Sequence, residues 1–189
     1  MRSIFIGFLL IFLDFNFNIG ESTIGLIPDF IGYILLVQGL REMEPESARF
    51  AQARPFAVGT GIYSAITYAL DLFGVTNQLG GLGIAFGFLY TIVSLCLAWL
   101  VVKGVQEAEQ RRRTDLNGHS LWTAWLLMAV FQLISYVFLF IPVLVLVGIL
   151  ASFVISIVFL VALHTAKNRY AELPPLPAAE CREPEREEE

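Results

Sequence analysis

Two aspartates near the N-terminus are the residues whose type and spacing most directly suggest chemistry in this sequence. Asp14 and Asp29 each lie in an apolar segment, and a short polar stretch around Glu21 separates the two segments. If these segments are antiparallel helices that reverse near Glu21, both carboxylates lie roughly 15 Å from the cytoplasmic boundary. That depth is near the middle of a hydrocarbon core about 30 Å thick. The spacing therefore predicts a pair of carboxylates inside the membrane.

Helix phase indicates that both aspartates face protein rather than lipid. Gly7 lies on the same helical face as Asp14, and Gly32 lies on the same face as Asp29. Small residues line helix contacts in membranes, so these faces should be shielded. Two carboxylates that lie at the same depth and are shielded from water cannot both be ionised without a large cost in free energy. The pair would share a proton or hold a monovalent cation.

Three further polar residues extend this hypothesis toward the outer surface. Asn18 and Glu21 lie in the polar turn, and Asp71 lies about 22 Å from the cytoplasmic end of a later apolar segment. Together with the aspartate pair they would form a proton- or cation-binding site with an entrance free of positive charge. A structural alternative stays open, because Pro28 and Asp29 could begin a short helix whose first turn favours an acidic side chain.

The elements that must position these residues are membrane helices. The chain has 189 residues, of which 57% are hydrophobic and 15% charged, and its mean hydropathy is +0.70. This composition is far from that of soluble proteins. Apolar segments near the length needed to cross a bilayer occur at residues 3–20, 23–40, 56–73, 82–102, 121–141 and 143–163. We therefore predict an all-α integral membrane bundle of about six transmembrane helices.

The basic residues predict the orientation of this bundle. With the N-terminus inside, all 12 lysines and arginines fall in cytoplasmic segments, and the turns at 18–23, 74–81 and 141–143 contain none. The positive-inside rule then places both termini in the cytoplasm. We expect one transmembrane domain over residues 1–170 and a disordered, acidic, proline-rich cytoplasmic tail over residues 171–189.

Two other groups of polar residues carry predictions. A stripe of hydroxyls follows one face of the third apolar segment toward Asp71 near its end: Thr60, Ser64 and Thr67. Hydroxyls in membrane helices also commonly bond their own backbone, so this stripe has a structural alternative. A basic run lies beside the membrane, where it could contact anionic lipid headgroups or only fix topology: Arg111, Arg112 and Arg113.

Several function classes find no support in the sequence. The histidines, His119 and His164, have no acidic or cysteine partner at metal-ligand spacing, and no common motif of hydrolases, metalloproteases or P-loop proteins occurs. We therefore expect no enzyme, no cofactor and no metal site. The net charge of −5 comes largely from the C-terminal end, and we expect no nucleic-acid partner.

The stretch NIGESTIGLIPDFIGYILL, with the preceding IFIGFLLIFLDFNF, resembles the N-terminal hairpin of an uncharacterised family of small polytopic bacterial membrane proteins. The resemblance covers about the first 40 residues, and beyond them only the hydropathy is similar. It implies a multi-pass protein of the bacterial cytoplasmic membrane and brings no activity with it.

Two classes of function follow from these observations. The first is a small transporter or ion-conducting protein that uses the aspartate pair to bind a proton or cation. The second is a non-catalytic membrane scaffold or accessory subunit, whose polar and small residues hold helices together or bind a larger membrane complex. Because 189 residues are few for alternating access, the first class would favour a homo-oligomer in the lipid bilayer.

Overall fold

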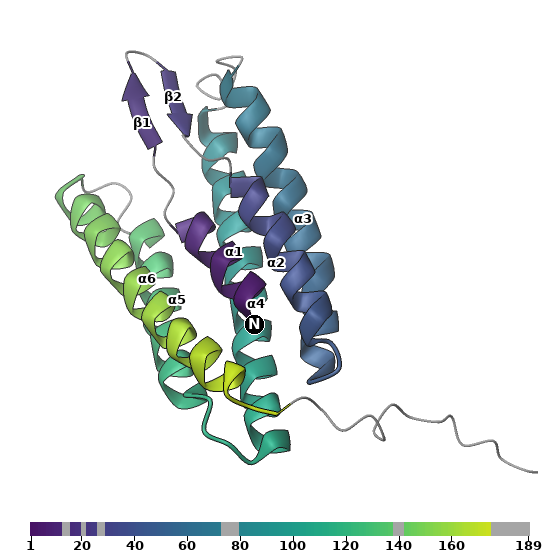
Figure 1. Cartoon of the computed structure of the whole chain (residues 1–189). Coiled ribbons are helices and arrows are strands. Elements are labelled where there is room, and N and C mark those ends of the chain that lie inside the picture. Colours follow the sequence, from purple (N-terminus) through teal and green to yellow (C-terminus); the bar gives the residue numbers. More distant parts are fainter. Residues whose placement is uncertain (13–15, 20–21, 26–28, 73–79, 138–141, 175–189) are drawn as a thin grey trace, which may run out of the picture.

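A computed structural model describes residues 1–12, 16–19, 22–25, 29–72, 80–137 and 142–174. These residues form six helices and one β-hairpin (Figure 1). In chain order the elements are α1 (Arg2–Phe12), β1 (Asn16–Ile19), β2 (Ser22–Gly25), α2 (Asp29–Met43), α3 (Ala48–Leu72), α4 (Gly80–Arg112), α5 (Gly118–Val137) and α6 (Pro142–Ala171). The predicted helical bundle is therefore confirmed, with the hairpin as an addition.

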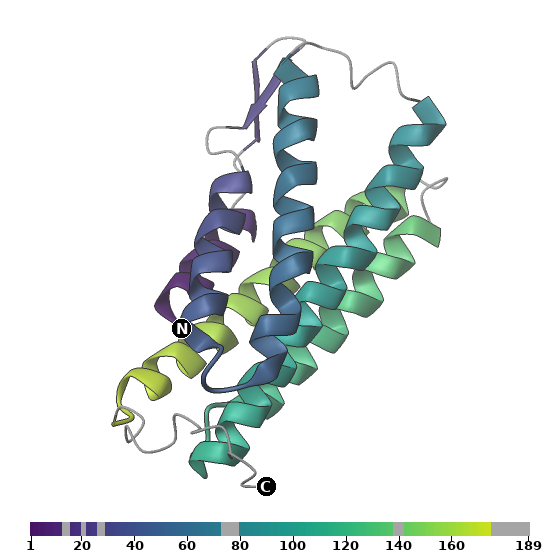
Figure 2. The ribbon, with the colours of Figure 1, turned by 90° about the vertical axis from the view of Figure 1, so that its right-hand side faces the viewer.

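The helices form a closed arrangement. Each one packs against the next helix in the chain, and α6 returns to contact α1. Figure 2 shows the short helices α1 and α2 on one side of the long helices α3 and α4. Large apolar side chains with almost no exposed surface fill the middle of the bundle: Ile4, Leu36, Leu40, Phe50, Val101, Leu121, Phe159 and Leu163. This core fixes α1 and α2 against the rest of the chain.

Glycines allow α1 and α2 to approach closely. A Cβ atom at Gly7 would lie 2.8 Å from the carbonyl oxygen of Gly32, and one at Gly39 would lie 2.5 Å from the backbone nitrogen of Ile4. No real side chain tolerates such distances to backbone atoms, so only glycine fits. The predicted contact faces of Gly7 and Gly32 are thus confirmed, in the manner expected of membrane helices.

A β-hairpin occupies the region in which the sequence predicts two helix ends and a turn. Asn16 pairs with Gly25 and Ile19 pairs with Ser22 in an antiparallel register. In β1 the apolar residues Phe17 and Ile19 alternate with Asn16 and Asn18, a pattern that fits a strand better than a helix. Asn, Ser and Gly also favour turns over helix interiors.

The predicted spans over residues 3–20 and 23–40 are therefore wrong in extent. Helix α1 ends at Phe12, and α2 begins at Asp29. The two helices are about 17 Å and about 22 Å long at 1.5 Å per residue, shorter than a bilayer core. The start of α2 at Asp29 is the alternative that the Pro28–Asp29 pair indicated.

Three helices in the described part of the chain are long and apolar enough to cross a membrane: Ala85–Arg112, Gly118–Val137 and Leu150–Ala171. Their outward faces carry large exposed apolar side chains, including Leu126, Leu133 and Val137 on α5 and Val154, Val158 and Val161 on α6. Such a surface is suited to lipid rather than to water. These helices indicate a membrane protein.

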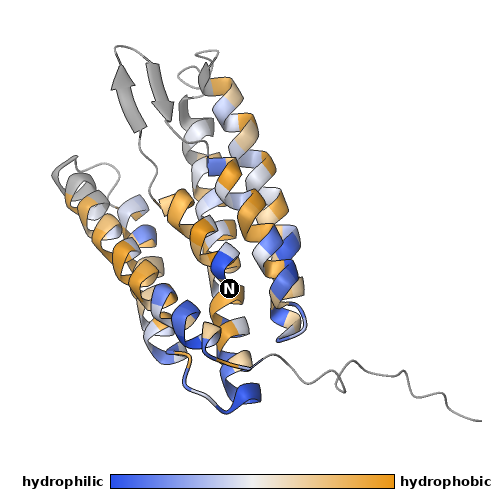
Figure 3. Ribbon diagram, viewed as in Figure 1, coloured by the Kyte–Doolittle hydropathy of each residue, from blue (hydrophilic) through white to orange (hydrophobic). Residues whose placement is uncertain are grey.

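Polar side chains gather at one end of the bundle, here called the polar end, where the α2–α3 and α4–α5 connections lie (Figure 3). Glu46 accepts hydrogen bonds there from Arg112 and, at 2.7 Å, from the hydroxyl of Tyr170. Arg49 contacts Glu107 at 2.8 Å. These contacts join the α2–α3 connection and the start of α3 to α4 and α6, and they hold the helix ends together.

Candidate functional site

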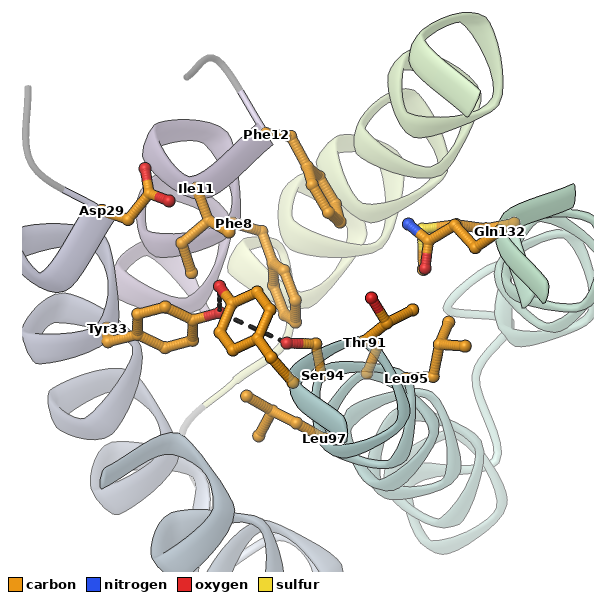
Figure 4. A pocket seen from close by; sticks show the side chains of 13 residues that line it. Phe8, Ile11, Phe12, Asp29, Tyr33, Thr91, Ser94, Leu95, Leu97 and Gln132 are labelled. Atoms are coloured by element: carbon orange, nitrogen blue, oxygen red, sulfur yellow. Dashed lines mark hydrogen bonds between the residues drawn. The ribbon is translucent and has the colours of Figure 1, made fainter. Parts of the chain in front are cut away.

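A cavity of about 250 Å³ lies between α1, α2, α4 and α5 (Figure 4). Its apolar lining comes mainly from Phe8, Ile11 and Phe12 of α1, Leu95, Leu97 and Ala98 of α4 and Met128 of α5. Its polar groups come from Asp29 and Tyr33 of α2, Tyr90, Thr91 and Ser94 of α4 and Gln132 of α5. A carboxylate, four hydroxyls and an amide therefore share one small space inside an apolar bundle.

Asp29 is the first residue of α2 and lines the cavity. At a helix N-terminus the exposed N–H groups and the helix dipole favour a negative charge. Figure 4 shows Asp29 beside Ile11 at one end of the cavity and Gln132 at the opposite end. The N-terminus of α2 thus places the Asp29 carboxylate at the cavity, and the exposed N–H groups of the helix supply a partial positive charge beside it.

A chain of hydroxyl groups crosses the cavity from α2 to α4. The Tyr33 hydroxyl lies 2.6 Å from the Tyr90 hydroxyl and 3.5 Å from Oγ of Ser94. Tyr33 is only 2% exposed, and the Tyr90 ring stacks on Tyr63 of α3 with ring centroids 5.0 Å apart. Since a buried hydroxyl without a partner is costly, these contacts hold three helices in register.

A second set of hydroxyl contacts connects α4 to α5. Thr91 donates to the carbonyl oxygen of Gly87 at 3.0 Å, and its oxygen lies 2.9 Å from the Tyr136 hydroxyl. Nearby, the Trp125 indole donates to the carbonyl oxygen of Leu95 at 3.0 Å. The polar wall of the cavity is thus built on side chains with fixed positions, which is what a binding site for a small ion requires.

The structure locates the predicted acidic residues unequally. Asp29 lines the cavity, whereas Asp14 and Glu21 lie outside the described residues. Asn18 lies in β1 opposite Thr23, and therefore in a strand rather than in the predicted turn between two helices. Asp71 lies in the last turn of α3, and its side chain is outside the described part. The predicted pairing of Asp14 with Asp29 therefore stays a prediction.

The predicted hydroxyl stripe on α3 bonds largely to its own helix. Thr60 donates to the carbonyl oxygen of Phe56 at 2.8 Å, and Thr67 donates to that of Tyr63 at 3.0 Å. The cavity described above includes neither these residues nor Ser64 in its lining. For Thr60 and Thr67 the structural alternative, backbone bonding within the helix, is the one observed.

The basic run at the end of α4 makes contacts within the protein. Arg112 pairs with Glu46, and its side chain is 12% exposed. It also donates to the carbonyl oxygen of Pro174 at 2.9 Å. Arg111 donates to the carbonyl oxygen of Pro45 at 2.6 Å, and Arg113 follows with a positive φ of 51°. Arg112 is thus directed toward protein, and the predicted contact of the run with lipid headgroups stays a prediction.

Sequence reasoning missed the two tyrosines at the centre of the cavity. Tyr33 follows Asp29 by one helical turn, and Tyr90 precedes Ser94 by the same spacing. Those spacings were a usable signal, since both place a hydroxyl on the face of another polar residue. Thr91, Ser94 and Gln132 are visible in the sequence as polar residues of apolar segments, although Thr91 and Ser94 fit helix packing equally well.

Comparison of the chain with protein-family models, with curated proteins and with solved structures finds no match. The function must therefore be argued from the cavity and from the apolar helices around it.

Proposed function

We propose that this chain is a multi-pass protein of the bacterial cytoplasmic membrane that carries a proton or monovalent cation through the cavity at Asp29. The observation that supports this most is the position of the Asp29 carboxylate in a 250 Å³ cavity beside the hydroxyls of Tyr33, Tyr90 and Ser94. Oxygen ligands of this kind suit a hard cation. An ionisable residue within membrane helices is a functional candidate by default.

The same proposal includes the topology. The polar end carries Arg41, Arg54, Arg111 and Arg169 near the ends of their helices, and it lies in the cytoplasm by the positive-inside rule. Six crossings with both termini cytoplasmic require that α1 and α2 cross together with residues 13–28. Backbone groups of a β-hairpin need hydrogen-bond partners, so β1 and β2 belong at the outer surface or beside a water-filled entrance.

Ion flux into liposomes tests the proposal. We would reconstitute the purified chain, impose gradients of protons, Na⁺ or K⁺ separately, and compare the wild type with an Asp14→Asn, Asp29→Asn double variant. We expect the double variant to fall to the rate of protein-free liposomes, since neutral amides neither bind a proton nor balance a cation. An Asp115→Asn variant, changed at an exposed carboxylate that pairs with Arg169, should retain the wild-type rate.

Flux that persists in the double variant would remove the transport proposal. A scaffold or accessory subunit would then lead, because such a protein should tolerate both changes with intact partner binding. The small residues Gly7, Gly32, Gly39 and Gly148 all contact neighbouring helices of the same chain, which is the packing role that this alternative gives to small residues.

A further inference from the structure

We infer that a groove between α2 and α3 binds the acyl chain of an anionic phospholipid, with the lipid headgroup held at Arg41 and Arg54. The groove has a volume of about 380 Å³ and opens on the outer surface of the bundle. Its lining includes Phe30, Ile34 and Val37 from α2 and Val58, Gly61 and Ala65 from α3. This site is separate from the cavity at Asp29, although the Tyr33 ring lies between the two.

The helical faces that line the groove each continue to a basic residue just beyond its lining. On α2, residues 30, 34, 37 and 41 follow the spacing of a single helical face, and the last of them is Arg41. On α3, residues 54, 58, 61 and 65 follow the same spacing, and the first of them is Arg54. Because the helices are antiparallel, the basic ends of the two faces lie toward the same end of the bundle.

Contacts between the helices place the two arginines level with each other. A Cβ atom at Gly61 would lie 3.0 Å from Cβ of Tyr33, and the Phe30 ring lies 6.1 Å from the Tyr68 ring, measured between centroids. Extended along both helices, this register sets Arg41 level with residues 53–57 of α3, a range that includes Arg54. Two cationic side chains thus lie beyond the same end of one apolar groove, toward the polar end of the bundle.

The arginines are available to a headgroup. Arg41 is exposed near the end of α2. One nitrogen of Arg54 contacts Glu44 at 2.7 Å, and its side chain is 42% exposed. A guanidinium has five N–H donors, so Arg54 can hold a phosphate oxygen while it keeps this contact. Glu42, the acidic neighbour of Arg41, accepts from Ser3 of α1 and therefore points to the other side of α2.

The distance from the far end of the groove to Arg41 favours a lipid over a protein partner. Phe30 and Arg41 lie eleven residues apart, which corresponds to about 16 Å along a helix. That is half of a hydrocarbon core about 30 Å thick, the depth of one leaflet. A phospholipid presents an acyl chain of this reach below a single phosphate, and anionic lipids are attracted to basic residues at a membrane surface.

Native mass spectrometry of the detergent-solubilised protein tests this inference. We would compare retention of phosphatidylglycerol and phosphatidylcholine with identical acyl chains. We expect preferential retention of phosphatidylglycerol, and affinity about fivefold lower for each of Arg41→Gln and Arg54→Gln. A Glu44→Gln variant should bind phosphatidylglycerol more tightly, because the change removes a negative charge beside Arg54. A merely structural role for Arg54 predicts no such gain.

A matched pair of variants tests the groove itself. Ala65 lines the groove, whereas Ala69 is exposed one turn further along α3 and outside it. Ala65→Trp should abolish retention, and Ala69→Trp should leave it unchanged. Equal retention of both lipids, or binding that survives in Ala65→Trp, would overturn the inference. Conversion of a dimer to a monomer by Ala65→Trp, without a change in lipid binding, would instead assign the groove to a second copy of the chain.

Discussion

Tyr33 is the side chain that contributes most to the order of the cavity. Its hydroxyl contacts Tyr90 and Ser94 of α4, and its ring separates the cavity from the groove between α2 and α3. Asp29 precedes it by one turn on the same helix. A change at this residue should therefore affect both the stability of the fold and the properties of the proposed ion site.

We expect Tyr33→Phe to lower the free energy of unfolding by about 1 kcal/mol, because the buried Tyr90 hydroxyl loses its closest partner. The same variant should slow ion flux into liposomes, since one oxygen leaves the cavity. Thermal unfolding in detergent and the flux assay measure the two effects.

Thr67→Val is the control for this prediction. Thr67 is half-buried on α3, and its hydroxyl bonds the backbone of its own helix. The variant should leave flux unchanged. Similar loss of flux in both variants would mean that the hydroxyl stripe of α3 takes part in transport after all.

At this scale the sequence predicted types of residues better than their partners. Asp29 was identifiable because a carboxylate in an apolar segment is rare, and the proline before it indicated a helix start. The contact between Tyr33 and Tyr90 joins residues 57 positions apart. Helix spacing shows which residues share a face, but it cannot show which face of another helix they meet.

At the scale of the elements, the close packing of α1 against α2 depends on glycines, which have no side chain. Gly39 has no room for a Cβ atom, because the backbone nitrogen of Ile4 lies 2.5 Å from where that atom would be. Gly59 of α3 is the opposite case, since no atom lies within 4 Å of its added Cβ. Substitutions at these two glycines therefore separate the effect of helix packing on stability from the effect of helix propensity.

Gly39→Ala should therefore destabilise the protein by about 1 to 3 kcal/mol, the usual cost of overpacking. Gly59→Ala should leave stability unchanged or raise it by up to about 1 kcal/mol, because alanine is the better helix former. Chemical denaturation of both variants in the same detergent measures the difference. Equal destabilisation would show that α1 and α2 are packed less closely than described.

The extent of the elements could be predicted only where apolar patterning sets it. The segment 82–102 lies within α4, but the helix continues to Arg112 because Lys, Gln and Glu are also good helix formers. The segment 143–163 lies within α6, which starts at Pro142, a favoured first residue. Hydropathy could not reveal the hairpin at 16–25, since isoleucine and phenylalanine are apolar in a strand as well as in a helix.

At the scale of the whole molecule, the contact between Glu46 and Arg112 holds the loop between α2 and α3 against the end of α4. The side chains of Glu46 and Arg112 are 2% and 12% exposed, and the Tyr170 hydroxyl also donates to Glu46. Burial alone would raise the pKa of Glu46, but the hydrogen bonds from Arg112 and Tyr170, together with the positive charges of Arg112 and Arg111, lower the pKa below its ordinary value of 4.5. Glu46 is therefore ionised in the native protein at neutral pH.

Glu46→Gln should destabilise the protein at pH 7 by about 3 kcal/mol, since it leaves the Arg112 charge almost buried and without its counter-ion. The wild type should lose stability as pH falls below 4.5 toward the lowered native pKa, because the unfolded state then binds a proton that the native state does not. The variant should lack this part of the acid loss. Thermal unfolding between roughly pH 2 and pH 8 would show both effects.

Glu44→Gln serves as the control, because Glu44 forms a more exposed contact with Arg54 and should contribute at most about 1 kcal/mol. If Glu46→Gln unfolds no more readily than Glu44→Gln, the polar end does not hold the helices together.

The short helices α1 and α2 have a further consequence for the surrounding bilayer. They rise about 17 Å and about 22 Å, whereas α5 rises about 30 Å. If α1 and α2 cross the bilayer as proposed, lipids on that flank of the protein meet a lower apolar wall than lipids beside α5. A bilayer adapts to such a step by thinning locally. A thicker membrane should therefore increase the hydrophobic mismatch more at α1 and α2 than at α5. Lipids with longer acyl chains would strain the packing around Asp29 first.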